Sequence, residues 1–149
     1  MIASVREKLR AVLTLGETPH QLGVAFGVGV FIALSPLIGL HIVLAAASAW
    51  AFRLNPVALF VGVLVNNPWT MVPLYAACLW LGTAIWPTDA VWSDIAWQGL
   101  TLVDFLSQFR PYLMPFVVGT TVAGAACGLL GYVVMKAVVT AYRRQRGRG

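Results

Sequence analysis

The polar residues that precede prolines are the first candidates for chemistry in this chain. Four dipeptides combine a residue that caps helix N-termini with the residue preferred at the first helical position: Thr18-Pro19, Ser35-Pro36, Asn55-Pro56 and Asn67-Pro68. We therefore expect a helix to begin at each of them. A helix N-terminus presents unpaired N–H groups and about half a positive charge, so two such ends brought together would bind an anion such as a phosphate.

Two of these helix starts, Ser35-Pro36 and Asn67-Pro68, lie inside apolar segments, where the available anion would be a lipid headgroup. Asn66 and Thr70 add more hydrogen-bonding groups than a helix cap requires. The alternative is that these polar residues only cap breaks in the helices and satisfy freed backbone groups. The ligand hypothesis predicts the following binding residues: Ser35, Pro36, Gly39, His41, Arg53, Asn66, Asn67, Pro68 and Thr70.

His41 and Arg53 have two interpretations each. A polar residue within a membrane is costly and often functional, but a lone histidine such as His41 is also often a hydrogen-bonded structural residue. Arg53 follows an apolar segment, so its side chain would either extend to the membrane surface or pair with a phosphate.

Catalytic and metal sites are not expected. None of the five acidic residues lies in a segment that must cross a membrane, and the chain has no Ser-His-acid set, glycine-rich phosphate loop or metal-ligand spacing. Cys78 and Cys127 lack the spacing of a zinc or redox motif. We therefore predict a protein without enzyme activity, metal or cofactor.

The composition indicates a membrane protein. The 149 residues are 60% hydrophobic and only 10% charged, whereas a soluble domain carries about 25% charged residues. Basic residues gather at both ends of the chain, but without the aromatic interleaving and basic face of a nucleic-acid-binding protein. The positive-inside rule then places both termini in the cytoplasm and the chain in the inner membrane.

The expected fold is all-α, in a single membrane domain. A spanning helix needs about 20 apolar residues, and the pieces before the two breaks are shorter, which favours re-entrant hairpins over kinked spanning helices. The predicted segments are a basic amphipathic surface helix (1–18), a first broken hairpin (23–54), a second broken hairpin (55–86), a polar interfacial loop (87–110), a spanning helix (111–141) and a basic tail (142–149).

Gly124 and Gly128 in the predicted spanning helix form a GxxxG pair, which permits close helix contact. A transport path is hard to enclose in one protomer of this size. We therefore expect a homo-oligomer that packs through these two glycines.

Two motifs carry a family resemblance. The S-P-x-x-G element at 35–39 lies in the stretch Gly27–His41, and the N-P-x-T-M-x-P element at 67–73 lies in the stretch Asn67–Tyr75. Together with Arg53–Pro56 and Leu81-Gly82, they resemble the bacterial membrane family called domain of unknown function 2062. The resemblance supplies no catalytic residues. Some members carry glycosyltransferase-like domains, which implies a role in envelope or lipid-linked sugar metabolism.

The sequence therefore predicts a small transporter or binding protein for an anionic, phosphate-bearing lipid, with membrane lipids as its partners and no nucleic acid. The alternative is a non-catalytic scaffold or accessory subunit in envelope assembly, with the Trp-rich loop 87–110 as its docking surface.

Overall fold

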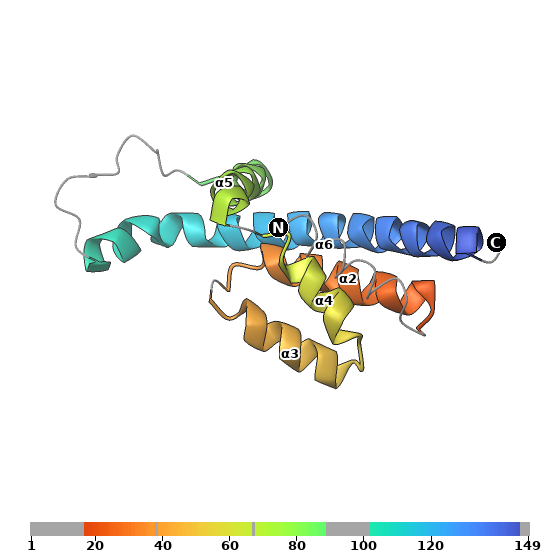
Figure 1. Ribbon diagram of the computed structural model, residues 1–149. Helices are drawn as coiled ribbons and strands as arrows, with labels where there is room; N and C mark the ends of the chain where they lie inside the picture. Colours follow the sequence, from red (N-terminus) through yellow and green to blue (C-terminus); the bar gives the residue numbers. More distant parts are fainter. Residues whose placement is uncertain (1–16, 38, 67, 89–101, 147–149) are drawn as a thin grey trace.

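The structure is a computed structural model that describes residues 17–37, 39–66, 68–88 and 102–146 (Figure 1). These residues form helices joined by turns, with no strand among them, which confirms the all-α prediction. The expected surface helix 1–18 lies almost wholly outside the described residues. The helices are α2 (Pro19–Leu34), α3 (His41–Ala51), α4 (Pro56–Val63), α5 (Pro68–Ile85) and α6 (Leu102–Arg146).

Three of the four expected helix starts are confirmed. The Thr18 side chain caps α2 in a capping box with Gln21, and the Asn55 side chain accepts a hydrogen bond of 2.9 Å from the N–H of Ala58 at the start of α4. The helix α5 begins at Pro68. Each start places a proline at the position where its missing N–H costs nothing.

The expected helix start at Ser35-Pro36 is wrong. Ser35 is instead the C-cap of α2, with its N–H bonded to the carbonyl of Ile32 at 3.0 Å, and α3 begins only at His41. A residue before proline is restricted to extended backbone, and Ser35 adopts a ψ of 147°. That conformation suits the end of one helix as well as the start of the next. The chain then turns through Gly39, whose φ is +88°.

The helix α2 lies at the centre of the bundle. It packs against α6 on one side and α4 on the other, α3 packs mainly against α4, and α5 packs against α6 (Figure 1). Along α2, Gly23 faces Tyr132 and Gly27 faces Gly128, so α2 runs antiparallel to α6. Gly62 of α4 contacts Phe26 and Gly29. These contacts place α4 beside the middle of α2.

Pairs of glycines bring the backbones of these helices into direct contact. At α2 and α6, a Cβ atom on Gly27 would lie 2.6 Å from the carbonyl oxygen of Gly128, which is a clash. At the other crossings an added Cβ atom would overlap the facing backbone even more. The three crossing pairs are Gly27 with Gly128, Gly29 with Gly62, and Gly82 with Gly119.

The GxxxG pair is used inside the chain. Gly124 and Gly128 are both buried, and they pack against Phe31 and Gly27 of α2. Because α2 covers these glycines, they make a contact within the chain, and the homo-oligomer stays a prediction. The motif indicated a close helix contact correctly and only the partner differs.

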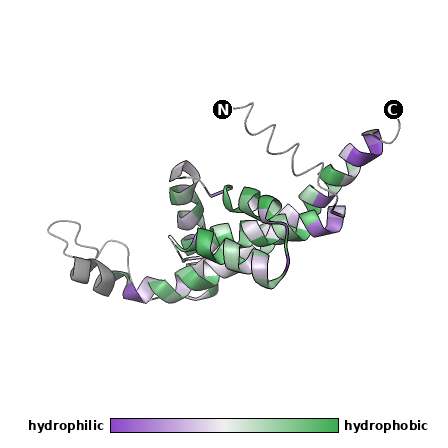
Figure 2. Ribbon diagram, turned by 60° about the horizontal axis from the view of Figure 1, so that its bottom comes forward, coloured by the Kyte–Doolittle hydropathy of each residue, from purple (hydrophilic) through white to green (hydrophobic). Residues whose placement is uncertain are grey.

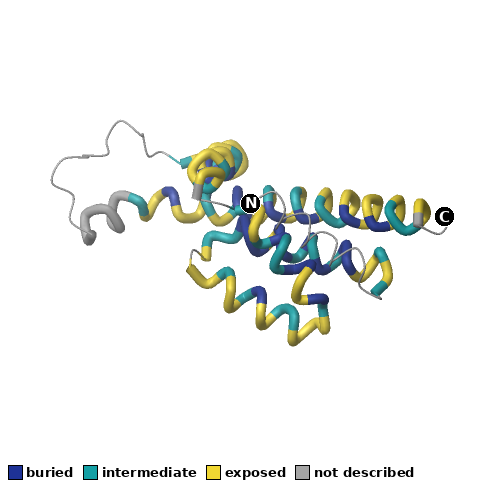
Figure 3. Tube along the Cα trace, viewed as in Figure 1, coloured by how far each residue is buried: buried dark blue, intermediate teal, exposed yellow. Residues whose placement is uncertain are grey.

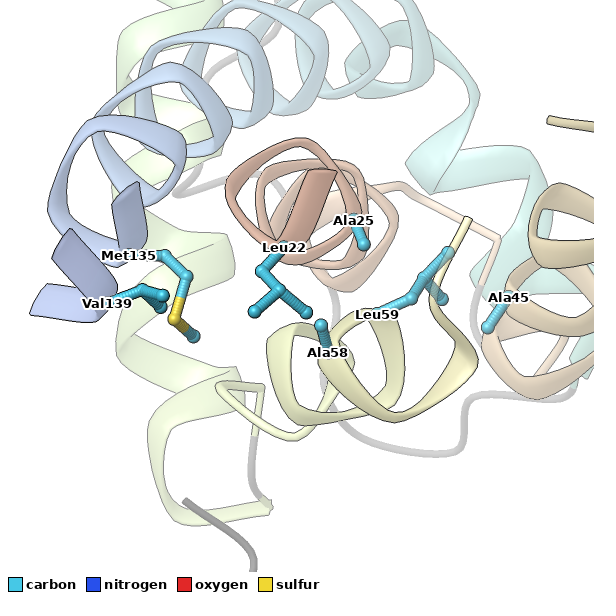
Figure 4. Packing of buried hydrophobic residues seen from close by; sticks show 7 residues of the cluster. All are labelled: Leu22, Ala25, Ala45, Ala58, Leu59, Met135 and Val139. Atoms are coloured by element: carbon cyan, nitrogen blue, oxygen red, sulfur yellow. The ribbon is translucent and has the colours of Figure 1, made fainter. Parts of the chain in front are cut away.

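A small apolar core joins α2, α4 and α6. Figure 4 shows Leu22 of α2 between Ala58 of α4 and the pair Met135 and Val139 of α6. All four side chains are buried. This core lies near the start of α2, and a second cluster around Leu34 and Cys78 lies near its end.

The helix α6 is longer than expected. It has 45 residues, so residues 102–110 of the predicted loop and residues 142–146 of the predicted tail are helical. The remaining loop residues 89–101 lie outside the described part. Polarity alone does not distinguish an exposed helical turn from a loop, because charged and amide side chains are good helix formers.

Only α6 is long and apolar enough to cross a membrane, judged by length and composition over the described residues, and the qualifying stretch is Phe109–Gln145. The helices α2, α3 and α4 have 16, 11 and 8 residues, fewer than the about 20 that a spanning helix needs. The two predicted hairpins are not confirmed, since α5 packs against α6 and α3 mainly against α4.

The α5–α6 crossing generates the first prediction. A Gly119→Val substitution places methyl groups against the backbone of Cys78, and we expect it to lower the free energy of unfolding by about 2 kcal/mol or more. Unfolding in detergent, followed by tryptophan fluorescence, measures this. Ala126→Val on the exposed side of the same helix is the control. Equal losses in both variants would contradict a backbone contact at Gly119.

Candidate functional site

Three polar residues meet at the end of α2, and we call Ser35, Asn66 and Tyr75 the polar cluster. The Asn66 Nδ2 atom donates to the carbonyl of Ala33 at 2.7 Å and to the Tyr75 hydroxyl at 3.2 Å. The Tyr75 hydroxyl in turn donates to the carbonyl of Ser35 at 3.2 Å. These bonds join the end of α2, the turn after α4 and the middle of α5.

Two oxygens of the polar cluster are buried without a hydrogen-bond partner in the described structure, Ser35 Oγ and Asn66 Oδ1. His41 Nε2 at the start of α3 is in the same state. Leaving a buried polar group unpaired costs about 1–3 kcal/mol. Because three such atoms occur around the break between α2 and α3 and the turn after α4, this region is a candidate binding site.

The other residues predicted near the breaks have simpler roles. Pro36 is half-buried and Gly39 is exposed in the loop after α2. Thr70 lies in the first turn of α5, where its hydroxyl donates to the carbonyl of Val65 at 3.3 Å. Pro68 begins α5, and Asn67 lies outside the described residues.

Arg53 is not part of the polar cluster, which corrects the prediction that it supplies the counter-charge there. It lies between α3 and α4, beside the start of α2, whereas Ser35 lies at the end of α2. A helix of 16 residues is about 24 Å long. Because Arg53 lies beside the start of α2 and Ser35 at its end, the two residues lie at opposite ends of the bundle.

The backbone of Arg53 is left-handed, with a φ of +51°, at a position where glycine is usual. The N–H of Phe52 bonds to the carbonyl of Ser48, and the N–H of Leu54 bonds to that of Ala49, both at 3.0 Å. This is the hydrogen-bond pattern that ends many helices. A non-glycine residue in this conformation costs about 1–2 kcal/mol.

A pocket of about 330 Å³, which we call the α2–α4 pocket, lies between the first turns of α2 and the turn that leads into α4. The N-termini of these two helices therefore lie side by side. The expected pairing of helix starts does occur, but at Thr18-Pro19 and Asn55-Pro56. The residues that line the pocket are Glu17, His20, Gln21, Val24, Phe52, Arg53, Leu54 and Asn55.

A chain of hydrogen bonds leads from the α2–α4 pocket to α6. His20 Nδ1 and the Tyr132 hydroxyl share a hydrogen bond of 2.9 Å, and Lys136 Nζ donates to the same hydroxyl at 3.4 Å. Lys136 and Arg144 line a second pocket of about 650 Å³ along the last turns of α6. This end of the bundle thus gathers cationic side chains around two helix N-termini.

Sequence reasoning did not find Tyr75, His20 or Tyr132. Tyr75 and Tyr132 lie in apolar segments whose sequence is typical of membrane-spanning helices. Only the packing of the helices shows that their hydroxyls have polar partners. A tyrosine within an apolar run is still a usable signal, since a buried hydroxyl normally has a partner. His20 lies directly after Thr18-Pro19, so it lines the pocket because α2 starts there.

The described residues define a class, a helical bundle with polar groups at both ends of α2 and one helix that is long and apolar enough to cross a membrane. The chain belongs to the family described as an uncharacterized protein conserved in bacteria (DUF2062), whose model matches residues 3–148. The resemblance drawn from the S-P-x-x-G and N-P-x-T-M-x-P elements is thereby confirmed. No curated protein and no solved structure matches the chain.

The hydrogen bonds of the polar cluster generate a prediction. A Tyr75→Phe substitution removes the donor to the Ser35 carbonyl and one partner of Asn66, so we expect a loss of about 1–2 kcal/mol in the free energy of unfolding. Denaturant unfolding in detergent checks this. Val72→Ala, on the exposed side of the same helix, serves as the control. A Tyr75→Phe variant as stable as the parent would show that the hydroxyl does not join the three elements.

Proposed function

We propose that this chain is an integral membrane protein that binds an anionic, phosphate-bearing lipid in the α2–α4 pocket. The observation that carries the proposal is the pairing of two capped helix N-termini around Arg53. Two such termini contribute together about one positive charge, part of which the C-terminus of α3 offsets, and a guanidinium binds phosphate through bidentate hydrogen bonds. The pocket therefore suits a phosphate headgroup.

Exposed apolar surface supports the membrane location. Trp50, Trp69 and Trp80 are 86%, 92% and 73% exposed, and Figure 3 shows exposed residues along the outer sides of α3, α5 and α6. Soluble proteins rarely expose large continuous apolar patches. Lipid tails would cover these side chains at no cost, because the bilayer core is itself apolar.

The distribution of polar residues supports an orientation. Hydrophilic colours mark the C-terminal end of α6, while the middle of the bundle is mostly hydrophobic (Figure 2). In our proposal this end, with Arg53, Lys136, Arg143 and Arg144, lies at the cytoplasmic surface of the inner membrane. The shorter helices α2, α3 and α4 then enter the bilayer without crossing it.

The lipid in this arrangement keeps its phosphate at headgroup depth. Arg53 donates hydrogen bonds to the phosphate oxygens, the positive ends of the two helix dipoles favour the negative charge, and Lys136 with Arg144 extends the positive field along α6. Glu17 also lines the pocket, with Oε2 buried and unpaired in the described structure. A hydroxyl or ammonium group of the headgroup would donate a hydrogen bond to it.

The strained backbone of Arg53 also favours a binding role. Glycine would occupy this left-handed position at lower cost. Stability alone would therefore favour glycine over arginine here. Strain of this kind often occurs at ligand sites. The alternative role as a scaffold that docks through 87–110 depends on residues of which 89–101 lie outside the described part, and no feature of the structure favours it.

Membrane location generates a direct prediction. The chain expressed in bacteria is expected to stay in the membrane fraction after an alkaline carbonate wash, because α6 spans the bilayer. Fractionation with an antibody against a C-terminal tag measures this. A peripheral membrane protein of the same host, released by the wash, is the control. Complete release of the chain would overturn the spanning assignment.

Lipid binding is tested by Arg53→Gly. Glycine accepts the left-handed conformation, so the variant should fold with a stability equal to or about 1 kcal/mol above that of the parent. We expect its affinity for phosphatidylglycerol to fall about tenfold or more, since a charge-assisted hydrogen bond is lost. Native mass spectrometry of the detergent-purified protein counts the bound lipid, with phosphate-free diacylglycerol as the reference.

The matched control is Arg110→Gln, which removes an exposed cation on the N-terminal half of α6. It should retain phosphatidylglycerol like the parent. Equal retention by Arg53→Gly and the parent, or equal retention of phosphatidylglycerol and diacylglycerol, would refute a phosphate site in the α2–α4 pocket.

A further inference from the structure

We propose that the polar cluster at the end of α2 binds a monovalent metal cation of the sodium class, with Ser35 Oγ and Asn66 Oδ1 as ligands. This site lies at the opposite end of α2 from the α2–α4 pocket, and it does not depend on lipid binding there. The argument uses the direction of the Asn66 amide, the burial of the two oxygens and the helix ends that surround them.

The direction of the Asn66 amide is determined by its partners. One of its two short contacts, at 2.7 Å, is with the carbonyl oxygen of Ala33, which only accepts hydrogen bonds. The atom in that contact must therefore be the amide nitrogen. Its second hydrogen goes to the Tyr75 hydroxyl. Both donors are thus used, and the atom left over is Oδ1, an acceptor.

The atoms left unpaired in the polar cluster are both oxygens. Asn66 Oδ1 and Ser35 Oγ are buried and make no hydrogen bond within the described structure. The backbone N–H of Ser35 is already bonded to the carbonyl of Ile32, so it does not serve either oxygen. Neutral amide, hydroxyl and carbonyl oxygens are the ligands preferred by hard cations.

Two helix C-termini lie beside the site. The bond from Asn66 to the Ala33 carbonyl joins the last turn of α2 to the chain just after α4 ends at Val63. Each helix C-terminus carries about half a negative charge, which the N-termini of α3 at His41 and α5 at Pro68 partly offset. A divalent ion would favour carboxylate ligands, and the polar cluster contains none.

The position in the chain also fits. The cluster lies where α2 is interrupted and α4 has just ended, and interrupted helices with exposed carbonyl ends hold cations in membrane proteins. A single water molecule is the competing occupant, since it would also satisfy two buried oxygens. Water and cation differ in their response to added sodium.

The test removes one ligand without breaking a hydrogen bond. Because Ser35 Oγ has no partner in the described structure, Ser35→Ala should keep the fold. The unfolding temperature of the full chain in detergent is measured against NaCl, with choline chloride added to hold the ionic strength constant. Ser48→Ala in α3 is the matched control. Isothermal titration with NaCl gives the affinity directly.

We expect the parent and Ser48→Ala to show a saturable stabilisation by sodium that choline does not reproduce. In Ser35→Ala the sodium concentration for half-saturation should rise about tenfold or more, since one ligand is lost. An equal response of Ser35→Ala and the parent would overturn the proposal. So would a parent that does not respond to sodium, which would leave water as the occupant.

Discussion

Direct contact between helix backbones at paired glycines is the constraint on which this structure depends. The pairs Gly27 with Gly128, Gly29 with Gly62, and Gly82 with Gly119 leave no room for a side chain, so each crossing point is defined to within an atom's width. Helices that touch in this way gain dispersion contacts along their backbones, which is the main source of association where lipid replaces water. The positions of the polar cluster and of the α2–α4 pocket depend on these crossings.

The most important result of this packing is that different kinds of polar group gather at the two ends of α2. The two central helices, α2 and α4, lie with their N-termini at one end and their C-termini at the other. Their dipoles therefore point the same way, while α6 runs antiparallel to α2. One end collects Arg53, His20 and the cationic residues of α6, while the other presents neutral oxygens.

Much of the fold could be predicted from local patterns, but the grouping of sites could not. Apolar runs and proline caps predicted the all-α class and the starts of α2, α4 and α5, since those signals act within a few residues. Ser35-Pro36 failed because extended backbone before proline suits either end of a helix. Which helix starts meet depends on glycines such as Gly29 and Gly62, whose partners are distant in sequence.

The hydroxyl of Tyr75 has a further consequence for α5. This helix touches α6 at one glycine crossing and α2 through apolar side chains near Leu34 and Cys78. Apolar contacts have no direction. They therefore do not by themselves determine the angle at which one helix crosses another. The bond from Tyr75 to the Ser35 carbonyl is directional. It therefore favours one orientation of α5 about this crossing, and its loss would leave that orientation mainly to apolar contacts.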